Sequence, residues 1–105
     1  MKFLVPWQSI DDPAQVERLE RELVRELAVG HPLFGLTFRA LAGRQDCDDV
    51  LFGILDSTSR VAVVHLTWIS NPPDRPPWPA AEIFENLDVW VRDCMLFEHA
   101  EFSGD

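Results

Sequence analysis

The stretch VAVVHLTWI, residues 61–69, decides the fold that we expect for this chain. Its β-branched and apolar side chains suit an extended strand, in which successive residues point to opposite faces. The side chains that share one face are Ala62, Val64, Leu66 and Trp68. His65 lies on the other face, so this stretch indicates one strand of a sheet with a titratable side chain set into it.

Two further strand-like segments precede this stretch. Residues 33–42 alternate apolar and polar side chains, and residues 50–55 are apolar on both faces, which is typical of a central strand. The connections at 43–49 and 56–60 are polar and too short for a parallel crossover. We therefore expect an antiparallel three-stranded meander, with residues 3–5 as a candidate fourth strand at its edge.

Helices are expected before and after the meander. Asp12 suits an N-cap, Pro13 suits the first helical position, and Gly30 suits the stop of a first helix. The apolar stripe of this helix is Val16, Leu19, Leu23, Val24, Leu27 and Ala28. A second helix is expected over residues 80–97, where the stripe is Ile83, Leu87, Trp90, Val91 and Cys94.

The expected architecture is a single α+β domain over residues 1–105. A chain of 105 residues suits one domain and is too short for two independent cores. We expect a two-layer sandwich in the order α-β-β-β-α, with both helices covering one face of the sheet. The connection at 70–79 holds five prolines and cannot be a helix or a central strand. Around Trp78 it is either a rigid crossover or an exposed recognition segment.

The charge of the chain points to the kind of partner. Asp and Glu number 18 against 9 Lys and Arg, and the formal net charge is −9. This balance argues against binding to nucleic acid or to an anionic membrane surface, both of which need clustered basic residues. A compact acidic domain instead attracts basic protein surfaces, so a basic protein is the expected partner.

The N-terminus and the cysteines predict a cytoplasmic protein. The apolar run that starts the chain stops at Pro6, far short of a signal peptide, and no stretch is long enough to span a bilayer. Cys47 and Cys94 are too few for a disulfide framework, and neither lies in a metal-ligand motif. We expect no cofactor and no metal.

Three features of the sequence provide candidate site residues. The acidic turn Asp46, Asp48 and Asp49 can cap a hairpin turn, form a patch for a partner, or hold a metal ion. His65 is either a sheet histidine bonded to a neighbour or a functional group. Trp78 is the aromatic residue of the proline-rich segment.

Three segments resemble a family of small uncharacterised bacterial proteins. They are GHPL at 30–33, DDVLF at 48–52 and VAVVHLTW at 61–68. The resemblance covers about residues 30–70 and implies a bacterial, cytoplasmic origin. It brings no activity, and no residue acquires a role from it.

No catalytic motif is found, so the first interpretation is a non-enzymatic protein-binding module, of the immunity type or a regulatory partner of a basic protein. Its partner-binding residues would be Asp46, Asp48, Asp49, His65 and Trp78. One alternative is a small enzyme or ligand-binding protein in which His65 works with Asp48 or Asp49. The other is a homodimer formed by sheet edges or by the broad apolar face of the second helix.

Overall fold

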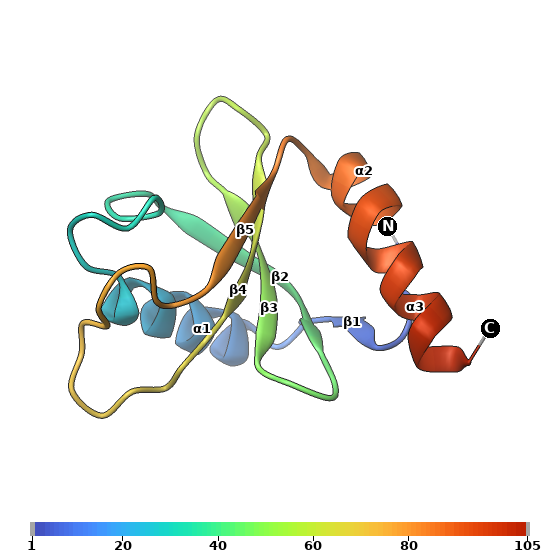
Figure 1. Cartoon of the computed structure of the whole chain (residues 1–105), viewed down its shortest axis with the longest axis horizontal. Coiled ribbons are helices and arrows are strands. Elements are labelled where there is room, and N and C mark those ends of the chain that lie inside the picture. The colour runs from blue at the N-terminus through green and yellow to red at the C-terminus, as the bar shows by residue number, and fades with distance from the viewer. Residues whose placement is uncertain (1, 105) are drawn as a thin grey trace.

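The computed structural model describes residues 2–104 as five antiparallel strands and two helical units (Figure 1). The strands are β1 (Trp7–Ser9), β2 (Phe38–Arg44), β3 (Asp49–Ile54), β4 (Val61–His65) and β5 (Ala81–Phe84). They form one sheet in the order β1-β2-β3-β4-β5. The helical elements are α1 (Pro13–Glu26), α2 (Leu87–Trp90), a π-helical turn η1 (Val91–Met95) and α3 (Leu96–Ser103). The last three are continuous and are called the C-terminal helix.

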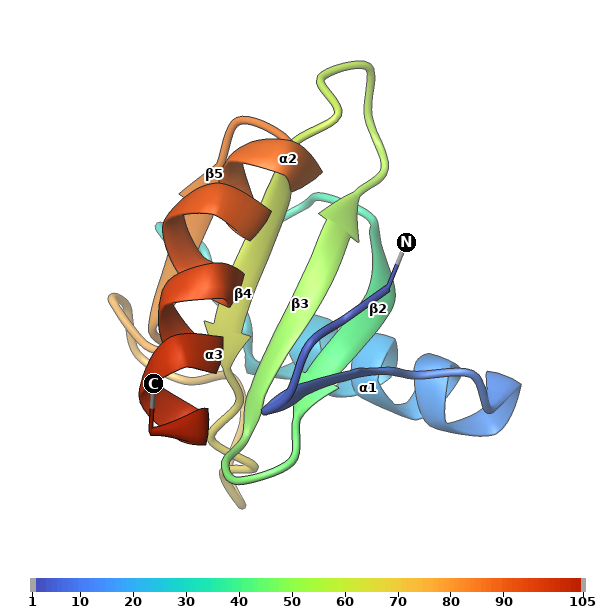
Figure 2. The same ribbon diagram turned by 90° about the vertical axis from the view of Figure 1, so that its right-hand side faces the viewer.

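The two helical units lie on opposite faces of the sheet (Figures 1 and 2). Alternate residues of β3 show this directly, because its side chains point to either face in turn. Phe52 is fully buried in the cluster that contains Leu23 of α1. Leu51, its neighbour, is fully buried in the cluster that contains Trp90 and Met95 of the C-terminal helix. The architecture is therefore helix, sheet, helix, with a core on each side.

The expected two-layer sandwich is wrong. The sheet has five strands instead of three, and its two helical units cover both faces instead of one. The physical reason lies in β3 and β4, which are apolar on both faces, so a second uncovered face would expose a large apolar area. The expected strand at 3–5 is also wrong, because the edge strand is β1, which begins after Pro6.

The expected second helix begins too early. Residues 81–84 form β5, which pairs antiparallel with β4, and the helix starts only after Asn86. The Asn86 side chain accepts a hydrogen bond from the Val89 amide at 2.9 Å, which is the N-cap that ends the strand and begins the helix. The strand forms because it gives hydrogen-bond partners to the backbone N–H and C=O groups at the edge of β4. A helix over 81–84 would leave those groups without partners.

The first helix is confirmed at its start. Asp12 is the N-cap, and its carboxylate accepts a hydrogen bond from the Ala14 amide at 3.0 Å, with Pro13 at the first helical position. The helix ends at Glu26, before Gly30. None of the helices within residues 2–104 is long and apolar enough to cross a lipid bilayer.

The connection at 66–80 contains no helix or strand, and α1 holds its start. The prolines predict this for residues 70–79, but the expected strand at 61–69 is wrong beyond His65, where β4 ends. Glu26 is fully buried, and its carboxylate accepts hydrogen bonds from the Thr67 and Trp68 amides at 2.9 Å each. Arg25 donates to the Ile69 carbonyl at 2.6 Å. Trp68 is held with φ of +51°, a conformation that is rare for a bulky residue and that marks the sharp turn away from β4.

The other end of this connection is held by a buried histidine. His31 lies just beyond α1, and its Nδ1 accepts a hydrogen bond from the Leu33 amide at 3.0 Å. Its Nε2 is therefore the nitrogen that donates to the Pro79 carbonyl, at 2.8 Å. The proline-rich segment is thus tied at both ends, and β5 is delivered to the edge of β4 from a fixed position.

Candidate functional site

A groove of about 680 Å³ lies between β5, the C-terminal helix and the end of β2. Two kinds of side chain line it. The carboxylates are Asp46, Glu82, Asp93, Glu98 and Glu101. The aromatic rings are Phe84, Phe97 and Phe102. We call this feature the acidic groove.

The negative charge of the acidic groove is not neutralised from within. Its one lining cation is Arg44, whose guanidinium pairs with Asp46 at 2.8 Å and also with Glu98. These contacts, the hydrogen bond to Asp46 above all, raise the pKa of Arg44 above its usual value. Within residues 2–104, neither Glu82 nor Glu101 forms an ion pair. The groove therefore keeps free carboxylates that can meet an incoming cation.

The aromatic rings give the groove an apolar wall. Phe84 is buried, but Phe97 is 63% exposed and Phe102 is 44% exposed. Exposed aromatic faces beside carboxylates suit the aliphatic stem and charged head of a lysine or arginine side chain. A side chain that has both an apolar stem and a positive charge therefore fits this groove better than a purely apolar or a purely ionic group.

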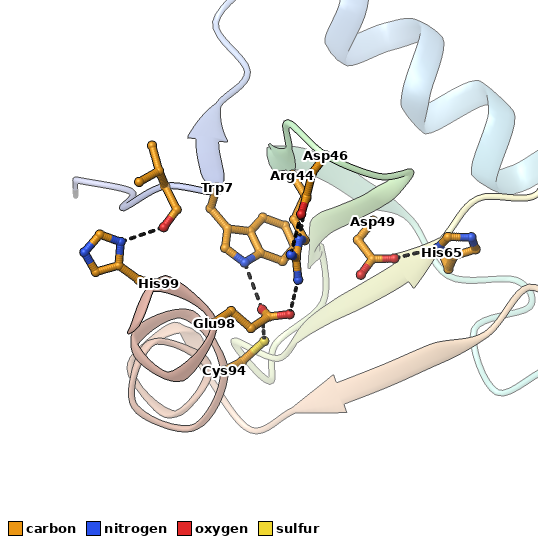
Figure 3. Close-up of polar contacts among 9 residues, drawn as sticks. Trp7, Arg44, Asp46, Asp49, His65, Cys94, Glu98 and His99 are labelled. Carbon is orange, nitrogen blue, oxygen red and sulfur yellow. Dashed lines mark hydrogen bonds and ion pairs between the residues drawn. The ribbon is translucent and has the colours of Figure 1, made fainter. Parts of the chain in front are cut away.

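Glu98 fixes the C-terminal helix against the sheet (Figure 3). Its Oε1 accepts hydrogen bonds from Trp7 Nε1 and from Cys94 Sγ, both at 2.9 Å, and its Oε2 accepts from Arg44. These donors come from β1, from η1 and from the end of β2, so one carboxylate joins three separate parts of the chain. His99, one residue later, bonds through Nδ1 to the Val5 carbonyl at 2.6 Å. These contacts hold the wall of the groove against β1, β2 and the segment before β1.

Cys94, in this network, is a poor nucleophile. Burial is the main cause that raises the pKa of its thiol to about 12, and the hydrogen bond to Glu98 and the charge of Glu82 add to it. The Trp90 indole lowers that pKa slightly. Trp90 Nε1 itself has no oxygen or nitrogen acceptor in the described part of the chain. Burial also raises the pKa of Cys47, although that residue is more exposed.

The two thiols should differ sharply in alkylation. At about pH 8 a thiol with a pKa near 12 has a thiolate fraction about a thousand-fold lower than one with the ordinary value of 9.0. We expect iodoacetamide to modify Cys47 slowly in the folded protein and to leave Cys94 unmodified until urea is added. The Cys47→Ser variant is the control and should show no labelling while folded. Fast labelling of Cys94 in the folded state would contradict the buried network.

The structure separates Asp46 of the acidic turn from Asp48 and Asp49, which line a different pocket. Asp46 faces Arg44 in the acidic groove. Asp48 is exposed, and its carbonyl accepts from the Leu66 amide at 3.2 Å. Asp49 lies directly opposite His65 across β3 and β4, and its Oδ1 is 2.7 Å from His65 Nδ1. No group of three or more metal-ligating side chains occurs in residues 2–104.

The Asp49–His65 pair is a surface contact. The side chains are 24% and 50% exposed. Asp49 also lines a smaller pocket of about 200 Å³ together with Arg18 and Trp68, but His65 is not among the residues that line it. Trp78 is 52% exposed on the proline-rich segment, apart from both pockets. The structure therefore brings Asp49 into contact with His65 and places Asp48 beside Asp49 in the smaller pocket, but it leaves Trp78 separate.

Sequence reasoning missed most of the acidic groove. Glu82 and Phe84 were expected on a helix, and Glu98, Glu101 and Phe102 lay at or beyond its expected end. The available signal was the aromatic residues that recur with acidic ones near the C-terminus. The chain matches no protein-family model, and no curated protein and no solved structure is significantly similar to it.

Proposed function

We propose that this protein is a cytoplasmic, non-enzymatic binding module that receives a basic segment of a partner protein in the acidic groove. The observation that carries the proposal is the composition of the groove, which five carboxylates line. Asp46 and Glu98 pair with Arg44, and Asp93 pairs with Arg92, but Glu82 and Glu101 form no ion pair among the described residues. The net charge of −9 supports it, because it steers basic partners toward the domain. An immunity-type or regulatory protein that masks a basic surface is the biological form of this proposal.

The mode of binding follows from the side chains. The stem of a partner lysine or arginine packs on Phe97 or Phe102, and its charged head reaches Glu82 or Glu101. These two carboxylates have no ion pair in the described structure, so no existing contact has to break first. The Glu98 network keeps the groove open and in shape before the partner arrives, which lowers the entropic cost of binding.

A defined peptide tests the proposal. The probe is an end-blocked eight-residue peptide in which lysine and valine alternate, with a glutamate–valine peptide as its negative control. We expect the double variant Glu82→Gln/Glu101→Gln to bind the lysine peptide at least about ten-fold more weakly than the wild type in fluorescence anisotropy. Raising the salt from about 50 mM to about 300 mM should weaken binding to the wild type.

Matched variants locate the site. Asp11→Asn/Glu17→Gln removes the same two charges from the α1 side of the sheet, where both side chains are exposed. It should change the affinity less than about three-fold. The variant Asp48→Asn/Asp49→Asn does the same for the acidic turn. Equal losses of affinity in all three double variants would show that only net charge matters and would contradict binding in the groove. A loss of affinity in Asp48→Asn/Asp49→Asn alone would place the binding site at the acidic turn.

Chemistry at His65 is the weaker candidate. The 2.7 Å contact with Asp49 is the geometry of an oriented histidine, as an acid–base group would need. The pair nevertheless lies on the surface, and the imidazole does not line the pocket that Asp49 shares with Trp68. The contact is therefore assigned to cross-strand pairing, which stabilises β3 against β4.

A further inference from the structure

β5 offers an open strand edge beside the acidic groove. It is the last strand of the sheet and pairs only with β4. Its register places Glu82 opposite Val63, and the His65 amide donates to the Ala80 carbonyl at 2.9 Å just before the strand begins. Hydrogen-bonded and non-hydrogen-bonded pairs alternate along an antiparallel ladder, so Glu82 and Phe84 bond to β4. Ala81 and Ile83 point their backbone N–H and C=O groups away from the sheet.

These outward backbone groups have no partner. Across the described residues, no backbone or side-chain atom bonds to the N–H or C=O of Ala81 or Ile83. Both residues are exposed, Ile83 by 37%. In Figure 2 the C-terminal helix runs in front of β5, at this side of the sheet. The open edge and the acidic groove are therefore adjacent, because Glu82 and Phe84 belong to β5 and also line the groove.

We propose that the basic segment binds as an added antiparallel strand on the edge of β5. This inference rests on the proposed function and specifies the partner's conformation, which is extended, and its pattern, which is basic at every second residue. Side chains of the added strand that share the face of Glu82 enter the acidic groove, and those that share the face of Ile83 lie on the other side of the sheet. Backbone hydrogen bonds supply affinity, and the groove supplies selectivity for positive charge.

The pairing geometry suits an opposite charge beside Glu82. Glu82 is bonded to β4, so a residue of the added strand opposite it occupies a non-hydrogen-bonded position. Side chains in such positions lie closest together, and opposite charges there stabilise the pair. The residues that bond to Ala81 and Ile83 then have their side chains on the far face, where the partner needs no charge.

Charge also excludes a second copy of this chain as the occupant. An antiparallel contact of two β5 edges that is centred on Glu82 would place this carboxylate directly opposite the same carboxylate of the other copy. Each copy also carries a net charge of −9. A strand of four residues is a short template for self-pairing. Light scattering should therefore give the mass of one chain, and a dimer abolished by Ile83→Pro would overturn the choice of occupant.

Two N-methylated forms of the lysine–valine peptide test strand addition. Antiparallel addition requires the valine amides to bond to β5 and the lysine amides to face solvent. Methylating the valine amides should weaken binding at least about ten-fold, and methylating the lysine amides should weaken it less than about three-fold. The two peptides have the same charge and composition, so each is the control for the other. The reverse order would indicate parallel strand addition, and equal effects would overturn strand addition.

A substitution in β5 provides a second test of strand addition. Ile83→Pro removes an outward N–H without removing a bond to β4, as edge positions tolerate, and it should weaken the unmodified peptide at least about ten-fold. If Glu82→Gln/Glu101→Gln weakens binding but both methylated peptides bind like the unmodified peptide, binding in the acidic groove is supported and strand addition is overturned. If the two methylated peptides differ in affinity but the double variant binds the unmodified peptide normally, strand addition is supported and binding in the acidic groove is overturned. Absence of binding by the unmodified peptide overturns both.

Discussion

Replacing Trp90 with alanine will lower the free energy of unfolding by about 3–5 kcal/mol. Trp90 is fully buried and forms the centre of the core beneath the C-terminal helix. Its ring meets Trp7 edge-to-face at a centroid distance of 5.2 Å, and Phe3 at 5.9 Å. Alanine would leave a cavity between two aromatic rings that rigid neighbours cannot fill. Urea unfolding followed by far-ultraviolet circular dichroism measures the loss.

Trp90→Phe is the matched control for this prediction. The indole N–H has no oxygen or nitrogen acceptor among the described residues, so phenylalanine removes no such bond. We expect it to cost about 1–2 kcal/mol, from lost packing alone. A loss below about 1 kcal/mol for Trp90→Ala would show that this core is not packed as described.

Replacing Glu26 with alanine should destabilise the fold by about 2–4 kcal/mol. Its fully buried carboxylate accepts from the Thr67 and Trp68 amides and from the Thr67 hydroxyl. Without it, two backbone N–H groups at the sharp turn after β4 lose their acceptor. Because the proline-rich segment starts there, the loss also loosens the path to β5. Glu17→Ala, on the exposed side of the same helix, is the control and should cost less than about 0.5 kcal/mol.

The same residue should make stability depend on pH. Burial, and next the hydrogen bond with Glu22, raise the pKa of Glu26 above its ordinary value of 4.5. The folded state therefore keeps a proton that the unfolded chain has lost. The stability from this proton is complete below pH 4.5 and is lost as the pH rises through the folded pKa. Between about pH 5 and about pH 8, the wild type should lose stability relative to Glu26→Gln.

Glu22 acts in the opposite direction, and its effect lies in a different pH range. Burial opposes its ionisation, but hydrogen bonds with Arg25 and Glu26 outweigh this, and its pKa lies below 4.5. Its contribution to stability is complete above that value and is lost as the pH falls further. Measurements above about pH 5 therefore isolate Glu26. Parallel pH profiles for the wild type and Glu26→Gln would rule out a shifted Glu26.

The predictions that succeeded rest on local chemistry. Asp12 and Pro13 specify a helix start through contacts within one turn, so no distant residue was needed to place it. The expected strands at 50–55 and 61–69 correctly located β3 (Asp49–Ile54) and the start of β4 (Val61–His65). The expected strand at 33–42 began five residues before β2 (Phe38–Arg44). In β2 the alternation does not continue past Ala40, because a bulge between Ala40 and Ala42 moves Ala42 into the opposite core.

The predictions that failed concern segments whose local sequence suits either a helix or a strand. The apolar spacing of Ile83, Leu87 and Trp90 suits a helix, and residues 87–103 form one. Residues 81–84 become a strand because the free edge of β4 offers them backbone partners. The acidic groove was out of reach for the same reason, since it joins Arg44, Glu82 and Glu101 from separate parts of the chain.

The amino-acid sequence by itself determined an acidic α+β domain with a capped N-terminal helix, antiparallel β3 and β4, and a proline-rich crossover. Each of these depends on side-chain periodicity, backbone restriction or net charge, which act over a few residues or over the chain as a whole. Only the tertiary structure decided that the helices cover opposite faces, that Asp49 meets His65, and that carboxylates and phenylalanines form a groove beside an open strand edge. Those outcomes depend on which distant backbone groups pair and which apolar faces remain to be covered, and both are settled only when the whole sheet is assembled.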